Sequence, residues 1–190
     1  MDLDRILLEY EAPIRLVAFA GILAAMAAWE AAAPRRTPGL TRRRRWPANL
    51  GLVAVDTIAL RIVFPAAAVG AAAYAQQAGW GILSASPLPY WAAVVVGVVV
   101  LDFVIYIQHV LFHAVPALWR LHRVHHADLD FDVTTGLRFH PIEILLSMGI
   151  KYAAIFALGP PVAAVVIFEV LLNATSMFNH GNVRLPLGLD

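Results

Sequence analysis

Long apolar runs constrain the fold of this chain more than any other feature of its sequence. As a helix, the run at residues 14–33 would span about 30 Å, at about 1.5 Å per residue, which matches one hydrocarbon core. The runs at 50–75 and 90–115 are at least as long. Charged residues make up only 14% of the chain, whereas a soluble domain carries about 25%. These patterns predict an all-α, polytopic helical membrane protein.

A basic segment separates the first two apolar runs and indicates how they are oriented. Six arginines lie within residues 34–45, and the positive-inside rule places such a short loop in the cytoplasm. Two crossings from there return the chain to the cytoplasmic side after residue 115, close to the histidines. A nucleic-acid or anionic-lipid patch is the alternative interpretation of the arginines. The net charge of +1 argues against a nucleic-acid partner.

The apolar runs also suggest how the chain is organised. Residues 1–89 are expected to form an N-terminal pair of transmembrane helices with the basic cytosolic loop between them, and residues 90–190 a second, histidine-rich module. The last apolar zone, 144–178, is interrupted by Gly-Pro-Pro and predicts a helical hairpin that returns to the cytoplasmic side. Acidic residues precede the first run, which favours a retained helix over a signal peptide. Asp56 and Arg61 lie in the second run, and we expect a structural role for them.

All seven histidines lie in the second half of the chain, and five of them form two closely spaced motifs. His109 and His113 make an HxxxH motif, and His122, His125 and His126 make an HxxHH motif. Residues three or four apart share one helix face, so the imidazoles of each motif can point at the same metal ion. Neutral imidazole suits zinc, copper, iron and nickel, and five imidazoles exceed the needs of one tetrahedral zinc. The motifs therefore predict a metal site and favour two metal ions.

Further polar residues accompany the motifs, and each has a structural alternative. Carboxylates could orient the imidazoles through their second ring nitrogen; the candidates are Asp102, Asp128, Asp130 and Glu143. His140 and His180 are candidate ligands, although a lone membrane histidine is more often a buried hydrogen-bonding group. A membrane metal-binding or transport protein without oxidation chemistry is the alternative function. It would need polar residues through the depth of the bilayer, and residues 94–100 offer none.

The order of these motifs resembles the fatty acid hydroxylase/sterol desaturase superfamily. The resemblance covers about residues 95–190 and rests on the HxxxH motif, on 118–126 and 134–141, and on Asn179-His180. It implies a membrane-bound oxidoreductase with a histidine-box centre of two iron ions. Such an enzyme uses O2 as co-substrate to hydroxylate or desaturate a membrane lipid, either a fatty acyl chain, a sterol or a related molecule. Its electrons come from an external donor of the cytochrome or ferredoxin type.

The resemblance also implies which residues hold the metal and where the protein resides. The implied metal-site residues are His109, His113, His122, His125 and His126, with His140 and His180 as further members. The positive-inside rule places their site on the cytoplasmic side of a multi-pass protein, and the scarcity of lysine favours a GC-rich bacterial genome, and with it a bacterial inner membrane. A further HxxHH box follows the position of His180 in the family, and this sequence reaches Asp190 without one. The metal site is therefore incomplete in the sequence as given: either the sequence is a fragment of such an enzyme or, as the alternative, it is a truncated, non-catalytic member of the same fold.

Overall fold

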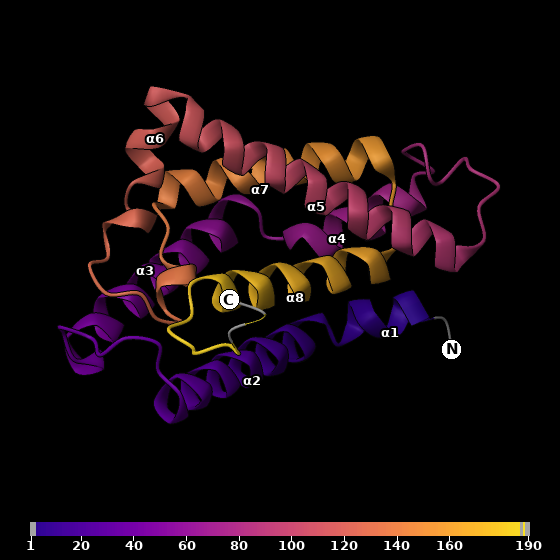
Figure 1. Ribbon diagram of the computed structural model, residues 1–190. Helices are drawn as coiled ribbons and strands as arrows, with labels where there is room; N and C mark the ends of the chain where they lie inside the picture. The colour runs from indigo at the N-terminus through magenta and orange to yellow at the C-terminus, as the bar shows by residue number, and fades with distance from the viewer. Residues whose placement is uncertain (1–2, 187, 189–190) are drawn as a thin grey trace.

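The computed structural model describes residues 3–186 and residue 188, and these residues are mainly helical. The elements are α1 (Leu3–Glu9), α2 (Glu11–Ala32), α3 (Arg42–Val63), α4 (Ala67–Gln77), α5 (Tyr90–Ala114), α6 (Pro116–His122), two 3₁₀ turns η1 (His125–Ala127) and η2 (Thr135–Leu137), α7 (Pro141–Leu158) and α8 (Val162–Asn179). The long helices run side by side along the molecule (Figure 1). The all-α class expected from the sequence is confirmed.

Within the described residues, five helical segments are long and apolar enough to cross a membrane. They are α2, the stretch Arg42–Gln77, α5, α7 and α8. Large apolar side chains on these segments face outward, among them Ile62 of α3 and Val99 of α5. Outward apolar surface with the backbone hydrogen bonds closed inside each helix is what a lipid environment requires. The chain is therefore an integral membrane protein, as its composition predicted.

Helix α8 is the central helix of the bundle. It packs against α2, α4 and α5, and Figure 1 shows it in yellow between α2 and α5. Val162, Val165 and Phe168 of α8 are buried, and they pack with Leu101 of α5 in the main core. Because α8 is surrounded by other helices, the residue that follows it is held in a fixed place.

The second apolar run departs from the sequence prediction. Helix α3 starts at Arg42, well before the apolar run, and ends at Val63, and α4 begins only at Ala67. Pro65 lies in the break, where proline removes a backbone donor and its ring clashes with the preceding turn. Helix α4 is rich in buried alanine, and its small side chains allow it to pack closely on α7 and α8.

The turn between α7 and α8 closes one end of the bundle. Gly159 ends α7 with φ of 63°, and Gly81 in the loop packed against it has φ of 95°. A Cβ atom on Gly81 would lie 2.1 Å from the Gly159 nitrogen, so this contact requires glycine. Leu83 donates its N–H to the Leu158 carbonyl at 2.7 Å, which holds loop and turn together. The reversal predicted from the Gly-Pro-Pro sequence is thus confirmed, and α8 returns to the opposite end. However, α7 and α8 are each long enough to cross a membrane, and they pack on other helices rather than closely on each other.

Candidate metal centre

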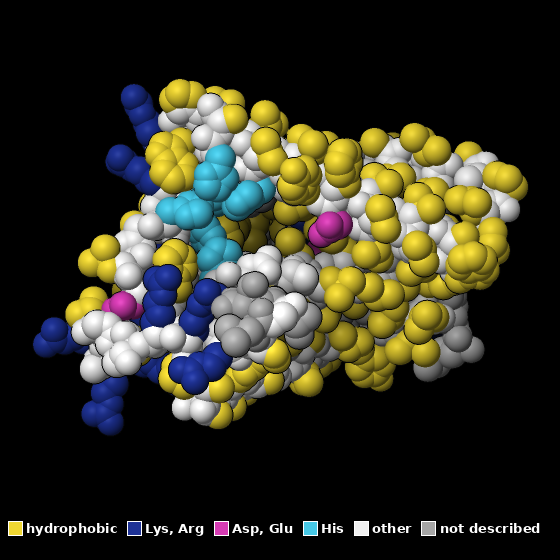
Figure 2. Space-filling view, viewed as in Figure 1, with side chains coloured by type: hydrophobic (Ala, Val, Ile, Leu, Met, Phe, Trp, Pro, Cys, Tyr) yellow, Lys and Arg dark blue, Asp and Glu magenta, His cyan; other side chains and the backbone are white. Residues whose placement is uncertain are grey.

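Six histidines gather at the end of the bundle opposite the α7–α8 turn. Figure 2 shows the imidazoles together beside a hollow in the surface. They come from four elements: His109 and His113 from α5, His122 from the end of α6, His125 and His126 from η1, and His180 directly after α8. The structure therefore brings together six of the seven histidines that the sequence singled out.

The reversal between α5 and α6 places the first two motifs against each other. Val115 is extended, with φ of −96° and ψ of 118°, because the residue before a proline avoids the helical region. Pro116 then starts α6 at a position where its missing N–H costs nothing. As a result, the rings of His109 and His113 both lie 4.8 Å from the ring of His122, centroid to centroid.

The spacing of the HxxHH motif suggested one continuous helix, but the motif is divided between two elements. Helix α6 ends at His122, and His125 and His126 lie in the separate turn η1. His126 still returns to His122, with 3.2 Å between their Nε2 atoms. His125 turns the other way and meets His180, with 2.8 Å between their Nε2 atoms. The histidines of the motif thus belong to two neighbouring groups of imidazoles and do not share a single helix face.

The Nε2 atoms converge at short distances, as ligands of a metal do. His109 and His113 approach each other at 3.2 Å through Nε2. One ligand nitrogen from each of His109, His113 and His122 can be chosen so that all three lie within 4.8 Å of one another. Three or four imidazole nitrogens at such spacing match the donor set of a zinc or iron site.

The outer ring nitrogens are held by oxygen acceptors. Nδ1 of His125 lies 3.2 Å from the Arg138 carbonyl, and Nδ1 of His180 lies 2.8 Å from the Ser176 carbonyl. A carbonyl only accepts, so both Nδ1 atoms donate, and in the neutral rings the Nε2 lone pairs face each other. Nδ1 of His122 lies 2.6 Å from a carboxylate oxygen of Glu143. Such outer hydrogen bonds fix the tautomer that binds metal.

The protonation states in η1 also suit metal binding. Burial, together with the nearby His180, lowers the pKa of His125 to about 3. Burial, together with the nearby His122, lowers the pKa of His126 to about 4. Both rings are therefore neutral at physiological pH, which is the form that binds a metal ion. Nε2 lone pairs that face each other repel, and a cation between them would remove this repulsion. The residues of the cluster therefore fit a metal ion.

Other residues singled out by the sequence have different roles. His140 caps α7, where its Nδ1 accepts the Ile142 N–H at 3.1 Å; within the described residues it has no close ring contact with the other histidines. Asp130 accepts the N–H groups of Gly39 and Leu40 instead of orienting an imidazole. Of the four candidate carboxylates, Glu143 is the one that contacts an imidazole among the described residues.

A buried ion-pair network pins the loop after η1 to α3. Arg45 lies 2.7 Å from Asp128 and 2.8 Å from Asp132. Asn49, one turn along α3, donates to the Thr134 hydroxyl at 2.9 Å. Burial alone would raise the pKa of Asp128, but hydrogen bonds from Arg45 and Asn49 outweigh it and lower the pKa to about 2. Arg45 of the basic segment thus stabilises the fold as well as contributing charge. The number of arginines in the segment did not reveal this structural role.

Glu30, at the end of α2, ties the same region to the segment after α8. It accepts the Val133 N–H at 2.7 Å and the Asn182 N–H at 2.8 Å. Arg42 lies 3.0 Å from its other oxygen. Since Asn182 follows His180 by two residues, this carboxylate holds the chain that carries the sixth imidazole.

A cavity of about 570 Å³ runs from the histidines into the bundle. His109, His125 and His180 line one part of it, and Lys151 and Glu169 line another. Apolar side chains cover much of the wall; they include Ile105, Phe112, Met148 and Leu172. Its volume and mostly apolar wall are typical of a site for a small organic molecule.

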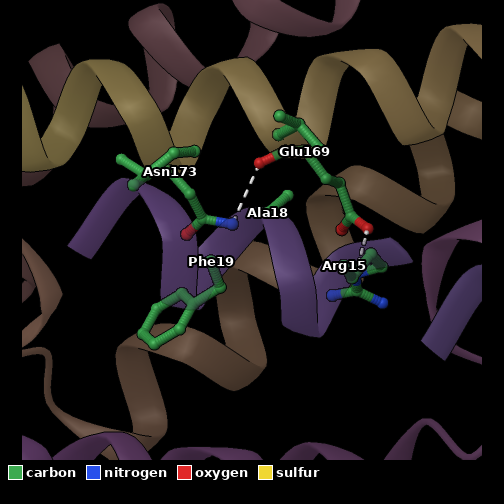
Figure 3. Close-up of a pocket in the computed structure, with 7 residues that line it drawn as sticks. Arg15, Ala18, Phe19, Glu169 and Asn173 are labelled. Carbon is green, nitrogen blue, oxygen red and sulfur yellow. Dashed lines mark hydrogen bonds and ion pairs between the residues drawn. The ribbon is translucent and has the colours of Figure 1, made fainter. Parts of the chain in front are cut away.

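A much smaller crevice lies between α2 and α8, away from the histidines. Its volume is about 10 Å³, room for about one water molecule. Figure 3 shows Arg15 of α2 beside the carboxylate of Glu169, and Asn173 beside the Glu169 carbonyl. This crevice is a packing feature around a buried ion pair, and the larger cavity is the one next to the imidazoles.

Comparisons with known proteins point to one family. The sequence profile described as fatty acid hydroxylase matches residues 94–189. Over 95 residues the sequence is 30% identical to ornithine lipid hydroxylase OlsE of Rhizobium tropici, a match that covers 50% of this chain and 29% of that protein. The chain thus spans less than a third of that relative's length. No solved structure matches the chain.

Proposed function

The chain belongs to the fatty acid hydroxylase family, and from this premise we propose that it forms the histidine centre of an O2-dependent di-iron enzyme that hydroxylates a membrane lipid. The relative is named a lipid hydroxylase, which favours hydroxylation over desaturation. Both reactions begin by removing hydrogen from an unactivated C–H bond. A bound iron pair would supply reductive activation of O2, so that one oxygen atom enters the C–H bond and the other leaves as water.

One observation carries the proposal: six imidazoles converge at the wall of a lipid-sized cavity. His109, His125 and His180 line the cavity as well as belonging to the cluster. A metal held there would adjoin the cavity, and the exposed His109 and His113 leave the other side of the cluster open at the surface. This arrangement distinguishes an oxidation site from a structural metal site, which would be closed on all sides.

The chain's own residues position the site. The six converging imidazoles would hold the metal: His109, His113, His122, His125, His126 and His180. Glu143 and the carbonyls of Arg138 and Ser176 orient three of these rings. Phe139 stacks on the His125 ring at 4.7 Å between centroids and shields it. The apolar wall of the cavity would bind the lipid chain.

We further propose that the histidine end faces the cytoplasm of a bacterium, at its inner membrane. Asp130 fixes the basic segment at Gly39 and Leu40 to this same end of the bundle. Arg and Lys side chains visible in Figure 2 lie at this end, which is the distribution that the positive-inside rule describes. A soluble cytochrome or ferredoxin would then reach the centre from the cytoplasm.

The test is metal content together with product formation. The protein should be purified in detergent from an iron-replete host, and its iron measured by mass spectrometry. We expect about two iron ions per chain and an O2-dependent increase of one oxygen atom in a lipid extract supplied with a ferredoxin system. Protein that contains no iron, and takes up none when Fe²⁺ is added, would overturn the proposal.

Two controls sharpen this test. Omission of O2 should abolish the product without changing the iron content. Metal flux through liposomes that contain the protein would favour transport over oxidation, because an oxidation site holds its ions through turnover.

A further inference from the structure

Three aspartates hold the loop between η1 and η2 from the inside. Asp128 and Asp132 lie 2.7 Å and 2.8 Å from the guanidinium of Arg45. Asp130 accepts two backbone N–H groups from the segment 39–40, at 3.1 Å and 2.7 Å. The three carboxylates are thus occupied by their own chain, and the loop is fixed at every second residue.

The two residues between these aspartates are large, apolar and exposed. Leu129 is 88% exposed and Phe131 is 49% exposed. A single exposed apolar side chain is ordinary on a protein surface, but two of them on a loop that is anchored at three points form a fixed apolar patch. Patches of this kind, bordered by polar residues, are typical of a site that binds another molecule.

Arginines without an ion-pair partner lie beside this apolar pair. Arg44 precedes Arg45, which binds Asp128, the residue before Leu129, so the segments that carry Arg44 and Leu129 are joined directly. Figure 2 shows Arg and Lys side chains above and below the histidines at this end of the bundle. Four of the arginines are exposed and have no ion-pair partner among the described residues: Arg43, Arg44, Arg120 and Arg123. Because the carboxylates of the loop bind inward, the charge presented outward is positive.

The loop lies outside the candidate membrane spans. Asp130 binds the segment 39–40, which connects the spans Glu11–Ala32 and Arg42–Gln77 and belongs to neither. The apolar neighbours of Asp130 therefore lie at the level of a connecting loop. A soluble protein can reach this level, whereas the acyl chains of the bilayer lie alongside the spans.

We propose that this surface docks an acidic soluble protein that carries electrons one at a time. The surface, here named the end patch, consists of Arg43, Arg44, Arg120, Arg123, Leu129 and Phe131. Its arginines attract an acidic partner, and its apolar pair supplies a contact that excludes water. Complexes between electron carriers have some of the smallest protein interfaces, so a patch of this size is sufficient.

The electron-carrying role of the partner rests on the proposed function. Insertion of one atom of O2 into a C–H bond, with release of the other atom as water, consumes two electrons and two protons. The partner supplies the two electrons in two one-electron steps and is oxidised in each, while the protons come from water. Leu129 follows His126 by three residues, about 10 Å of extended chain at most, so a partner docked on Leu129 lies near the imidazoles.

The experiment measures docking on the purified protein in nanodiscs of phosphatidylcholine, whose headgroups have no net charge. The probes are two acidic one-electron carriers, a plant-type ferredoxin and the soluble domain of cytochrome b5. Cytochrome c, a basic one-electron carrier, is the control and should not bind. We expect an acidic carrier to bind at least about ten-fold more tightly in 50 mM than in 500 mM NaCl, because salt screens the attraction between exposed charges.

Variants locate the contact. Arg44→Glu and Arg123→Glu should each weaken binding of the acidic carrier by about ten-fold. Arg5→Glu is the matched control, because Arg5 is exposed on α1, which contacts the start of α8 at the opposite end of the bundle. Leu129→Ser should also weaken binding by about ten-fold, and Leu88→Ser, at an exposed leucine before α5, should not. Leu129 is too exposed for its replacement to unfold the protein.

A single thiol distinguishes a protein partner from the bilayer. The chain has no cysteine, so Leu129→Cys creates one site for a fluorescent label. Brominated lipids in the nanodisc should leave the fluorescence of the label unchanged. The acidic carrier should slow the reaction of the unlabelled thiol with a water-soluble maleimide. Quenching by brominated lipids would show that the bilayer covers Leu129, and it would overturn the proposal.

Three further results would also overturn it. They are failure of both acidic carriers to bind, equal binding of cytochrome c, and wild-type affinity in both Leu129→Ser and Arg44→Glu. Docking is measured without turnover, so a protein that binds the carrier through the end patch but forms no hydroxylated lipid would refute only the proposed function. Lipid hydroxylation at the wild-type rate by both variants would refute only the end patch.

Discussion

The Nε2 atoms of His125 and His180 lie 2.8 Å apart, although 55 residues separate them in the sequence. Each Nδ1 donates to a backbone carbonyl, of Arg138 for His125 and of Ser176 for His180. With both Nδ1 atoms donating, the two Nε2 atoms are left facing each other, an arrangement that a metal cation between or beside them would stabilise. This pair is therefore the most direct indication of metal binding.

Replacing His180 by alanine should weaken metal binding. Saturation with Zn²⁺ at about 100 times its Kd would stabilise the wild-type protein by about 2.7 kcal/mol. The His180→Ala variant should show a smaller rise in Tm at the same Zn²⁺ concentration, because it lacks one member of the facing pair. Thermal unfolding in detergent, with and without Zn²⁺, measures the difference.

His140→Ala is the matched control for that variant. His140 caps α7 and does not join the cluster, so its loss should lower stability by about 1 kcal/mol, the usual effect of a lost cap. The shift in Tm produced by Zn²⁺ should stay as in the wild type. A loss of that shift in His140→Ala, but not in His180→Ala, would contradict the assignment of both residues.

Replacing Arg45 by methionine should destabilise the protein by about 3 kcal/mol, because two buried carboxylates would lose their cation. Arg45→Lys should recover only part of this, since lysine cannot form the two-pronged contact with Asp128. Arg43→Ala serves as control, because Arg43 is exposed on the same helix. Tm values in one detergent compare the three variants, and equal values for Arg43→Ala and Arg45→Met would contradict the network's importance.

Stability should fall in acid through Asp128. Its pKa is lowered in the folded protein from an ordinary value of 3.8 to about 2, so the folded state favours the ionised form. The contribution is therefore complete above pH about 4 and is lost as the pH falls toward about 2. Asp128→Asn should be less stable than wild type at pH 7 and should lose less further stability between pH 4 and 2. Parallel curves for the two proteins would exclude this role.

Glu143→Gln should weaken metal binding without unfolding the protein. The amide oxygen can still accept from His122, but the charge that strengthens the imidazole as a ligand is gone. Loss of such a supporting group typically reduces metal affinity by about 10-fold to 100-fold. Competition with a chelator measures the change in Kd. Asp130→Asn, which removes a carboxylate that binds backbone N–H groups instead, should leave the affinity unchanged.

Local signals in the sequence predicted the frame of the site. Pro116 marked the break after α5, and Gly-Pro-Pro marked the hairpin turn that returns His180 to the histidine end. The spacing of His109 and His113 correctly predicted a shared helix face, since α5 continues through both. These features depend on neighbouring residues, which is why the sequence alone reveals them.

Contacts between distant segments were not predictable in this way. In the sequence, Arg45 is one of the arginines of the basic segment that indicates membrane orientation. In the structure it binds Asp128, 83 positions away. Asp56 was expected to have a structural role, but it is buried in the cavity wall without an ion-pair partner among the described residues. Only the spacing of Arg45 and Asn49, one helical turn apart, could have indicated a common partner.

The position of His180 at the exit of the central helix sets the order of events during biogenesis. The ribosome makes His109 first and His180 much later, and His180 can reach its partner only after α8 has been made. Ions that arrive earlier would meet an unfinished set of ligands. If the imidazoles hold a metal as proposed, the full set of ligands would be complete only after α8 has inserted, so metal binding would report the correct insertion of the last helix.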